Sequence, residues 1–240
     1  VFIWDKNYES IAKISSPSKY FKTAEFSPDE QKILTTGMGD DFRFWNLTGD
    51  FHQTFSGHKD PLNGATFSPD GESILSWSRD STVRIWDLEG NNTNIFKAHS
   101  KNVIQAQFSE TGDKVITRSA DLSAKLWDLE SGSFNVFRPH VGWVFAANFS
   151  SAHGLVLTAS AENVARIWDL SGDLDATQLG HDDYVTDAFF SNKGDKILTI
   201  SIDKTAKLWD LEGNLIRVLG GHEGWVTHAI FSPNDRYIIT

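Results

Sequence analysis

The sequence predicts an all-β protein built from repeated four-stranded antiparallel sheets, and three observations lead to this prediction. A Trp recurs at a constant spacing of 41 residues, at Trp4, Trp45, Trp86, Trp127, Trp168 and Trp209. From Trp45 onward, a Phe-Ser pair begins 19 residues before each of these Trp residues, and a Thr or Ser lies ten residues before it. No stretch shows sustained helical periodicity. Short strands repeated about every 40 residues are typical of the blades of a β-propeller.

The strands of one repeat can be placed from its turn residues. Ser68-Pro69-Asp70-Gly71 has the Pro and Gly of a tight turn, and Ser78-Arg79-Asp80-Ser81 and Leu88-Glu89-Gly90 mark two more turns. Four strands are therefore expected, the first ending with residues 65–67 and the others at residues 73–76, 82–86 and 93–96.

The period also divides the chain into repeats. We expect a single domain over residues 1–240, with a half-blade at 1–16, repeats at about 17–57, 58–98, 99–139, 140–180 and 181–221, and a half-blade at 222–240. This division is compatible with a six-blade ring or with a window of a longer array of seven or more blades. The window is preferred, because a seam inside a hairpin would leave two half-blades with exposed edges.

Composition excludes several classes of function. The net charge of -10 disfavours non-specific nucleic-acid binding and favours cationic partners. The chain has no Cys, which excludes disulfides, thiolate catalysis and Cys-ligated zinc and suits a cytoplasmic protein. The longest uncharged run, residues 141–161, falls on two strands and a turn of the repeat, so no membrane partner is expected.

A His, a hydroxyl, an acid and a Trp recur at fixed spacing. Three repeats have the complete set: His58, Ser76, Asp80 and Trp86; His99, Thr117, Asp121 and Trp127; His181, Thr199, Asp203 and Trp209. A fourth has a longer acid: His140, Thr158, Glu162 and Trp168. Ser, His and Asp can form a catalytic triad. A triad is needed once, however, whereas these sets recur and Thr replaces Ser. We therefore expect structural networks, no catalytic residue, no metal and no cofactor.

One repeat departs from this pattern. In the repeat of residues 17–57, Pro17 occupies the position of the His and Gly39 occupies the position of the acid. The sequence predicts that the blade from Tyr20 to Phe55 is the least rigid.

The Trp-Asp endings, the upstream Gly-His pairs such as Gly57-His58, and the period together resemble the WD-repeat propellers. The resemblance covers the whole chain. It implies that indole, hydroxyl, imidazole and carboxylate form one chain that ties the strands of a blade together. The sequence is similar to bacterial WD-repeat arrays, which are often fused to signalling domains. This similarity implies other domains in a longer parent chain and a role as sensor or scaffold.

In such propellers, partners often contact the segment after Gly-His and the turn before the third strand. The positions that vary there predict a partner-binding surface of Tyr20, Arg79, Trp143, Phe145, Tyr184, Thr186 and Trp225. If the blades close into a ring, four aromatic residues of this surface form an arc on four consecutive blades: Trp143, Tyr184, Trp225 and Tyr20. Asp182, Asp183 and Glu223 lie in the same connections, which favours a Lys- or Arg-bearing peptide. The competing interpretation is that these rings only cover the core.

The function predicted from these residues is that of a non-catalytic scaffold or sensor that binds a protein or peptide on the top face. One alternative is a reader of a cationic tail or small ligand in an aromatic-lined channel. A weaker alternative is a hydrolytic enzyme, which would need an acid or a His outside the sets; His52, His153 and His228 are the candidates. Trp77 has no assigned role.

Overall fold

The computed structural model describes residues 1–240 except 16–19, 139–141, 151 and 173–176. The described residues form strands, turns and connections, with no helix among them. They divide into two compact units, residues 1–112 and 113–240, and each unit is considered by itself.

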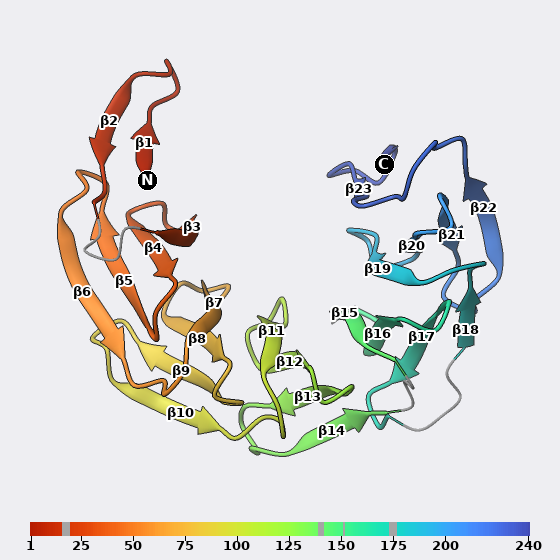
Figure 1. Cartoon of the computed structure of the whole chain (residues 1–240), viewed down its shortest axis with the longest axis horizontal. Helices are drawn as coiled ribbons and strands as arrows, with labels where there is room; N and C mark the ends of the chain where they lie inside the picture. Colours follow the sequence, from red (N-terminus) through yellow and green to blue (C-terminus); the bar gives the residue numbers. More distant parts are fainter. Residues whose placement is uncertain (16–19, 139–141, 151, 173–176) are drawn as a thin grey trace. The chain divides into compact units, whose positions relative to one another are not determined.

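Unit 1 contains a two-stranded sheet, two four-stranded sheets and one further strand (Figure 1). In chain order its strands are β1 (Phe2–Trp4), β2 (Ser10–Lys13), β3 (Phe21–Phe26), β4 (Lys32–Gly37), β5 (Asp41–Asn46), β6 (Phe51–Ser56), β7 (Leu62–Phe67), β8 (Ser73–Ser78), β9 (Val83–Asp87), β10 (Asn92–Phe96) and β11 (Val103–Phe108). In both four-stranded sheets each strand pairs antiparallel with the next one along the chain.

Unit 2 repeats the same plan, and its sheets also follow chain order. Its strands are β12 (Lys114–Ser119), β13 (Ala124–Asp128), β14 (Phe134–Phe137), β15 (Val144–Ser150), β16 (Leu155–Ser160), β17 (Val164–Asp169), β18 (Thr177–Gly180), β19 (Val185–Phe190), β20 (Ile197–Ser201), β21 (Ala206–Trp209), β22 (Leu215–Leu219), β23 (Ile230–Phe231) and β24 (Ile238–Ile239).

The second and third strands of every repeat pair in one register. Ile74 lies opposite Trp86 in β8 and β9, and Ile197 lies opposite Trp209 in β20 and β21. This register places the hydroxyl residue of the second strand two positions from the partner of the Trp, on the same face of the sheet. The constant offset of ten residues in the sequence is therefore the cross-strand geometry of one hairpin.

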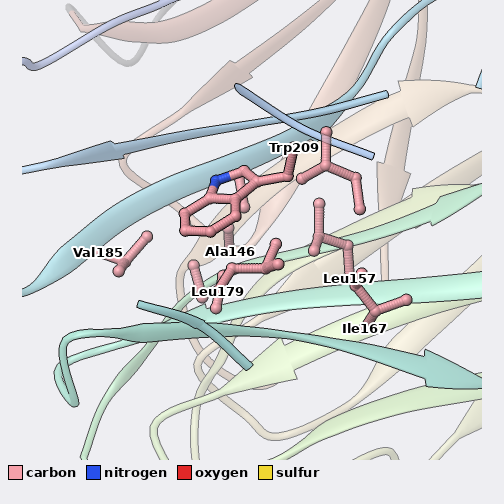
Figure 2. Close-up of a cluster of buried hydrophobic side chains, with 10 residues drawn as sticks. Ala146, Leu157, Ile167, Leu179, Val185 and Trp209 are labelled. Atoms are coloured by element: carbon pink, nitrogen blue, oxygen red, sulfur yellow. The ribbon is translucent and has the colours of Figure 1, made fainter. Parts of the chain in front are cut away.

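The core of each unit lies between consecutive sheets. In unit 1, Trp86 packs edge-on against Phe42 and Phe55 of the preceding sheet, at ring-centroid distances of 5.6 and 6.0 Å. In unit 2, Trp209 belongs to a buried cluster that includes Ala146 and Val185 (Figure 2). The repeated Trp thus contributes to the packing between repeats as well as to its own sheet.

The structure confirms the expected all-β fold of repeated four-stranded antiparallel sheets. The expected strands of residues 58–98 correspond to β7, β8, β9 and β10, and the uncharged run falls on β15 and β16. None of the described segments is a helix long and apolar enough to cross a membrane. The single domain over residues 1–240 stays a prediction.

Candidate functional site

The polar set of residues 58–98 forms a continuous hydrogen-bonded chain. Trp86 Nε1 donates to Ser76 Oγ at 2.8 Å, and Ser76 Oγ lies 2.8 Å from His58 Nε2. On the other side of the ring, His58 Nδ1 lies 3.0 Å from Asp80 Oδ2. An indole N–H can only donate and an ionised carboxylate can only accept. Ser76 therefore donates its proton to Nε2, and the Nδ1 proton points to Asp80.

The set of residues 181–221 repeats this geometry in unit 2. Trp209 Nε1 donates to Thr199 Oγ1 at 2.9 Å, and Thr199 Oγ1 lies 2.7 Å from His181 Nε2. His181 Nδ1 lies 2.8 Å from Asp203 Oδ2. Ser and Thr are interchangeable at this position because the network uses only the hydroxyl.

The carboxylates of these chains are held ionised by their donors. Burial alone raises the pKa of Asp80, but hydrogen bonds from Thr82, the Lys59 backbone amide and His58 together lower it to about 2. Asp203 accepts the equivalent hydrogen bonds from Thr205, the Asp182 amide and His181, and they lower its pKa to about 2 as well. Burial lowers the pKa of His58 and His181, although the adjacent carboxylates oppose this shift.

The other predicted sets contain the same link between indole and hydroxyl. Trp127 Nε1 donates to Thr117 Oγ1 at 3.2 Å, and Trp168 Nε1 donates to Thr158 Oγ1 at 2.8 Å. His99 is buried in unit 1, Asp121 is half-buried in unit 2, and His140 lies outside the described residues.

The longer acid of the fourth set has partners that Asp80 and Asp203 do not use. Glu162 Oε2 accepts from Arg166 at 2.7 Å, and Glu162 Oε1 accepts from the Gly142 amide at 3.2 Å. The repeat without a His or an acid keeps the bond between indole and hydroxyl: Trp45 Nε1 donates to Thr35 Oγ1 at 2.8 Å.

Burial makes these networks unsuitable for catalysis. The distances around His58 resemble those of a Ser-His-Asp triad. Ser76 is, however, completely buried, and its oxygen already accepts a proton from Trp86. A substrate cannot reach that oxygen without opening the sheet. Among the described residues, no group of three or more His, Asp or Glu side chains is placed to hold a metal ion.

Three of the predicted partner-binding side chains are strongly exposed on unit 2. Trp143, Tyr184 and Trp225 are 63%, 46% and 68% exposed. They occupy the same position in three consecutive repeats, and we call them the aromatic row. The backbones of two of them are tied to the turn before the third strand: the Ala161 amide donates to the Trp143 carbonyl at 3.0 Å, and the Ile202 amide donates to the Tyr184 carbonyl at 3.1 Å. At Trp143 and Tyr184 the backbone is therefore held while the ring faces solvent.

The remaining predicted residues differ in their exposure. Phe145 and Thr186 are half-buried. Thr186 Oγ1 donates a hydrogen bond to the Ile200 carbonyl at 3.4 Å. Tyr20 is 71% exposed in unit 1, and Arg79 is exposed in the same unit. The arc over four blades stays a prediction.

Sequence reasoning missed the role of Trp77, and the structure assigns one. Trp77 lies directly opposite Gly64 in the pairing of β7 and β8, and its Nε1 donates to the Ile104 carbonyl of β11 at 3.1 Å. A Cβ at Gly64 would come within 2.3 Å of the Trp77 ring, so only Gly fits beneath it. The signal was a Gly facing a Trp across one hairpin. Its meaning depends on the cross-strand register.

Arg118 occupies the position of Trp77 one repeat later and acts in a similar way. Its Nη1 donates to the Val144 carbonyl of the next repeat at 3.2 Å. Burial lowers the pKa of Arg118, and the nearby Asp187 opposes that shift. In these two repeats the residue nine positions before the Trp links its own repeat to the next one, through an indole in unit 1 and a guanidinium in unit 2.

These observations define a class of protein: an array of four-stranded antiparallel sheets, each joined by a Trp-hydroxyl bond that some repeats extend to a His and an acid. The family model of the WD domain, G-beta repeat, matches residues 49–87, 90–128, 132–169, 172–210 and 213–240. The chain belongs to this WD40 family. The match begins at residue 49, inside the repeat that lacks the His and the acid and after its Trp45. No curated protein matches the chain. WD40 repeats generally mediate protein–protein interactions, and proteins built from them are typically non-enzymatic.

Proposed function

We propose that this chain is a non-catalytic interaction domain that binds a protein or peptide partner through the aromatic row of unit 2. The observation that carries the proposal is the contrast between two sets of aromatic side chains. Trp168 and Trp209, which the fold requires, are 1% and 6% exposed, whereas Trp143 and Trp225 are 63% and 68% exposed. Large aromatic rings such as Trp and Tyr are among the side chains that dominate binding energy at protein interfaces.

The charges beside the aromatic row support a cationic partner. Asp182 and Glu223 are exposed and Asp183 is half-buried, and all three lie one or two positions before a row residue in the sequence. An Arg or Lys side chain placed over Tyr184 would gain both a ring contact and an opposite charge.

The channel-reader alternative has less support. In unit 2, a cavity of about 470 Å³ is lined by residues such as Phe190, Asn192 and Phe231, and no member of the aromatic row contributes to it. The exposure of the row instead favours a partner that lies on the surface. The hydroxyl groups of the His58 and His181 networks are buried, so a hydrolase would depend on a group outside the sets. The candidates His52, His153 and His228 are exposed and lie in different repeats, which gives this alternative little support.

The biological setting we propose follows the resemblance to bacterial WD-repeat arrays. The domain would act as a sensor or scaffold for signalling domains of a longer cytoplasmic protein. The absence of Cys and the net charge of -10 are compatible with this setting.

The test compares the wild-type chain with a Trp143→Ala/Tyr184→Ala/Trp225→Ala variant. Partners are captured from a source lysate and identified by mass spectrometry, and each purified partner is then measured by calorimetry. We expect the triple variant to weaken binding by at least about tenfold, since each lost hot-spot ring costs about 2 kcal/mol or more. Far-UV circular dichroism and thermal unfolding establish that the variant is folded.

A matched control removes three other exposed side chains, Tyr8, Ile95 and Tyr237, which are 87%, 57% and 71% exposed. The Tyr8→Ala/Ile95→Ala/Tyr237→Ala variant should bind like the wild type. Equal affinities of the wild type and the aromatic-row variant would place recognition elsewhere on the chain.

A further inference from the structure

A cavity of about 470 Å³ lies in unit 1, at the C-terminal ends of the first strands of three consecutive repeats. Its walls come from equivalent positions of β3, β7 and β11, including Phe26, Phe67 and Phe108. The position of the aromatic row lies at the other end of these strands, where unit 1 has Pro61 and Asn102. The cavity therefore belongs to a different unit and a different end of the repeat from the site proposed above.

The cavity contains one carboxylate that is held in a fixed orientation. Glu25 Oε1 accepts from the Phe67 amide at 2.8 Å and from Thr66 Oγ1 at 2.9 Å. Both donors lie on the next repeat, so Glu25 spans the boundary between β3 and β7. Among the described residues, no Lys, Arg or His forms an ion pair with Glu25 at the cavity. Its carboxylate is oriented by neutral donors, and its charge is not compensated by an ion pair.

The fold itself does not require an acid at this position. The equivalent residues in later repeats are Thr66, Gln107, Asn148, Phe189 and Ile230. The neutral side chains Thr66 and Gln107 occupy it in the two neighbouring repeats of the same unit. Glu25 is therefore a feature of this cavity rather than of the repeat.

The surroundings of Glu25 combine an exposed ring with negative charge. Phe26 is 55% exposed, whereas its equivalents Phe67 and Phe108 are 7% and 9% exposed. Glu110 lies on the cavity wall and is exposed. The described residues that line the cavity include two acids, Glu25 and Glu110, and no Lys, Arg or His. The electrostatic potential of this region therefore favours a cation.

We propose that this cavity binds an arginine side chain of a peptide partner. A guanidinium is planar, so it can stack on the Phe26 ring, and it is more weakly hydrated than an ammonium ion. Its several N–H donors can reach the Glu25 carboxylate, and Glu110 on the cavity wall adds negative charge. This second recognition point does not depend on the aromatic row.

The test follows the backbone amide of Phe67 by NMR in the ¹⁵N-labelled chain, because that amide is bonded to Glu25. The probe is the acetylated and amidated tripeptide Phe-Arg-Phe at millimolar concentration. The comparison peptides are Phe-citrulline-Phe, which has the same shape without the charge, and Phe-Lys-Phe. We expect a saturable shift of the Phe67 amide with the arginine peptide, weaker binding of the lysine peptide and no saturable shift with the citrulline peptide.

The decisive variant is Glu25→Gln, which keeps an oxygen acceptor for Phe67 and Thr66 and removes only the charge. We expect it to weaken binding of the arginine peptide by about tenfold or more, as for the loss of a hydrogen bond to a charged group. Glu89→Gln makes the same change at an exposed residue that does not line the cavity, and it should bind like the wild type.

Three results would overturn the proposal: no saturable shift with the arginine peptide, equal shifts with the citrulline peptide, or unchanged binding by Glu25→Gln. Binding of the lysine peptide with equal affinity would overturn the choice of arginine. The Trp143→Ala/Tyr184→Ala/Trp225→Ala variant should retain the Phe67 shift, so failure of one site is distinguishable from failure of the other.

Discussion

The side chains of His58 and His181 sit between one group that can only donate and one that can only accept. The indole supplies the donor at one end of each chain, and the ionised Asp supplies the acceptor at the other. The neutral tautomer with its proton on Nδ1 satisfies every member of the chain. A second proton on the ring would remove the acceptor that the buried hydroxyl needs.

Protonation should therefore destabilise the fold in two stages. The pKa of His58 and His181 is lowered by burial from the ordinary value of 6.5, so their contribution to stability is complete above that value and declines as the pH falls below it. The pKa of Asp80 and Asp203 is lowered from 3.8 to about 2, so their contribution is lost between these values. Urea unfolding at a series of pH values and constant ionic strength measures both stages.

A variant identifies the source of the lower stage. Asp203→Asn should lower the free energy of unfolding at neutral pH and reduce its decline below pH 3.8. A free energy of unfolding that stays constant from neutral pH to below 3.8 would contradict the assignment of His and Asp protonation to these networks.

At the scale of the element, the hairpin of the second and third strands is the unit that carries the network. In the hairpin of β4 and β5, the Thr35 hydroxyl accepts a hydrogen bond from the Trp45 indole. In the hairpin of β20 and β21, the Thr199 hydroxyl accepts from the Trp209 indole and also bonds to the His181 ring. The same hydroxyl position therefore satisfies one buried partner in one sheet and two in another.

This difference predicts unequal costs for one substitution. Thr35→Val should lower the free energy of unfolding by about 1–2 kcal/mol, because one buried indole N–H loses its acceptor. Thr199→Val should lower it by about 2–4 kcal/mol, because the buried imidazole loses its partner too. Chemical denaturation of the two variants gives the comparison, and equal costs would show that the His link adds no stability.

The same reasoning supports the expectation that the blade from Tyr20 to Phe55 is the least rigid. Its repeat has Gly39 in place of the acid and Pro17 in place of the His, and Pro17 lies outside the described residues. Hydrogen exchange measured by mass spectrometry should show faster exchange in β4 and β5 than in β8 and β9. Uniform protection of the two sheets would contradict it.

At the scale of the whole molecule, the net charge of -10 acts on every cationic partner. Both proposed sites combine exposed rings with acidic side chains, so attraction at long range adds to ring contacts at short range.

Added salt should therefore weaken but not abolish binding of a cationic peptide. The dissociation constant should rise as the ionic strength increases beyond about 0.1 M, where charges are screened over about 10 Å. The contribution of the rings should persist at higher salt. Calorimetry over a range of NaCl concentrations measures both parts, and tighter binding at high salt would contradict an electrostatic contribution.

The sequence by itself determined the repeat, its hairpins and the membership of the His58 and His181 sets, because all of these depend on spacing within about 40 residues. Trp86 and Ser76, for example, are ten residues apart and meet across one turn. The exposure of Trp143, Tyr184 and Trp225 agrees with their selection as a candidate surface, since they hold a position that varies between repeats while the scaffold stays constant.

Only the tertiary structure decided what depends on contacts between repeats. The packing of Trp77 over Gly64 and its bond to Ile104 require the cross-strand register and the neighbouring sheet. The cavity beside Glu25 requires the ends of three strands that are about 41 residues apart in the chain. Local spacing sets the geometry within a sheet, whereas the packing of consecutive sheets sets which side chains share a cavity or remain in solvent.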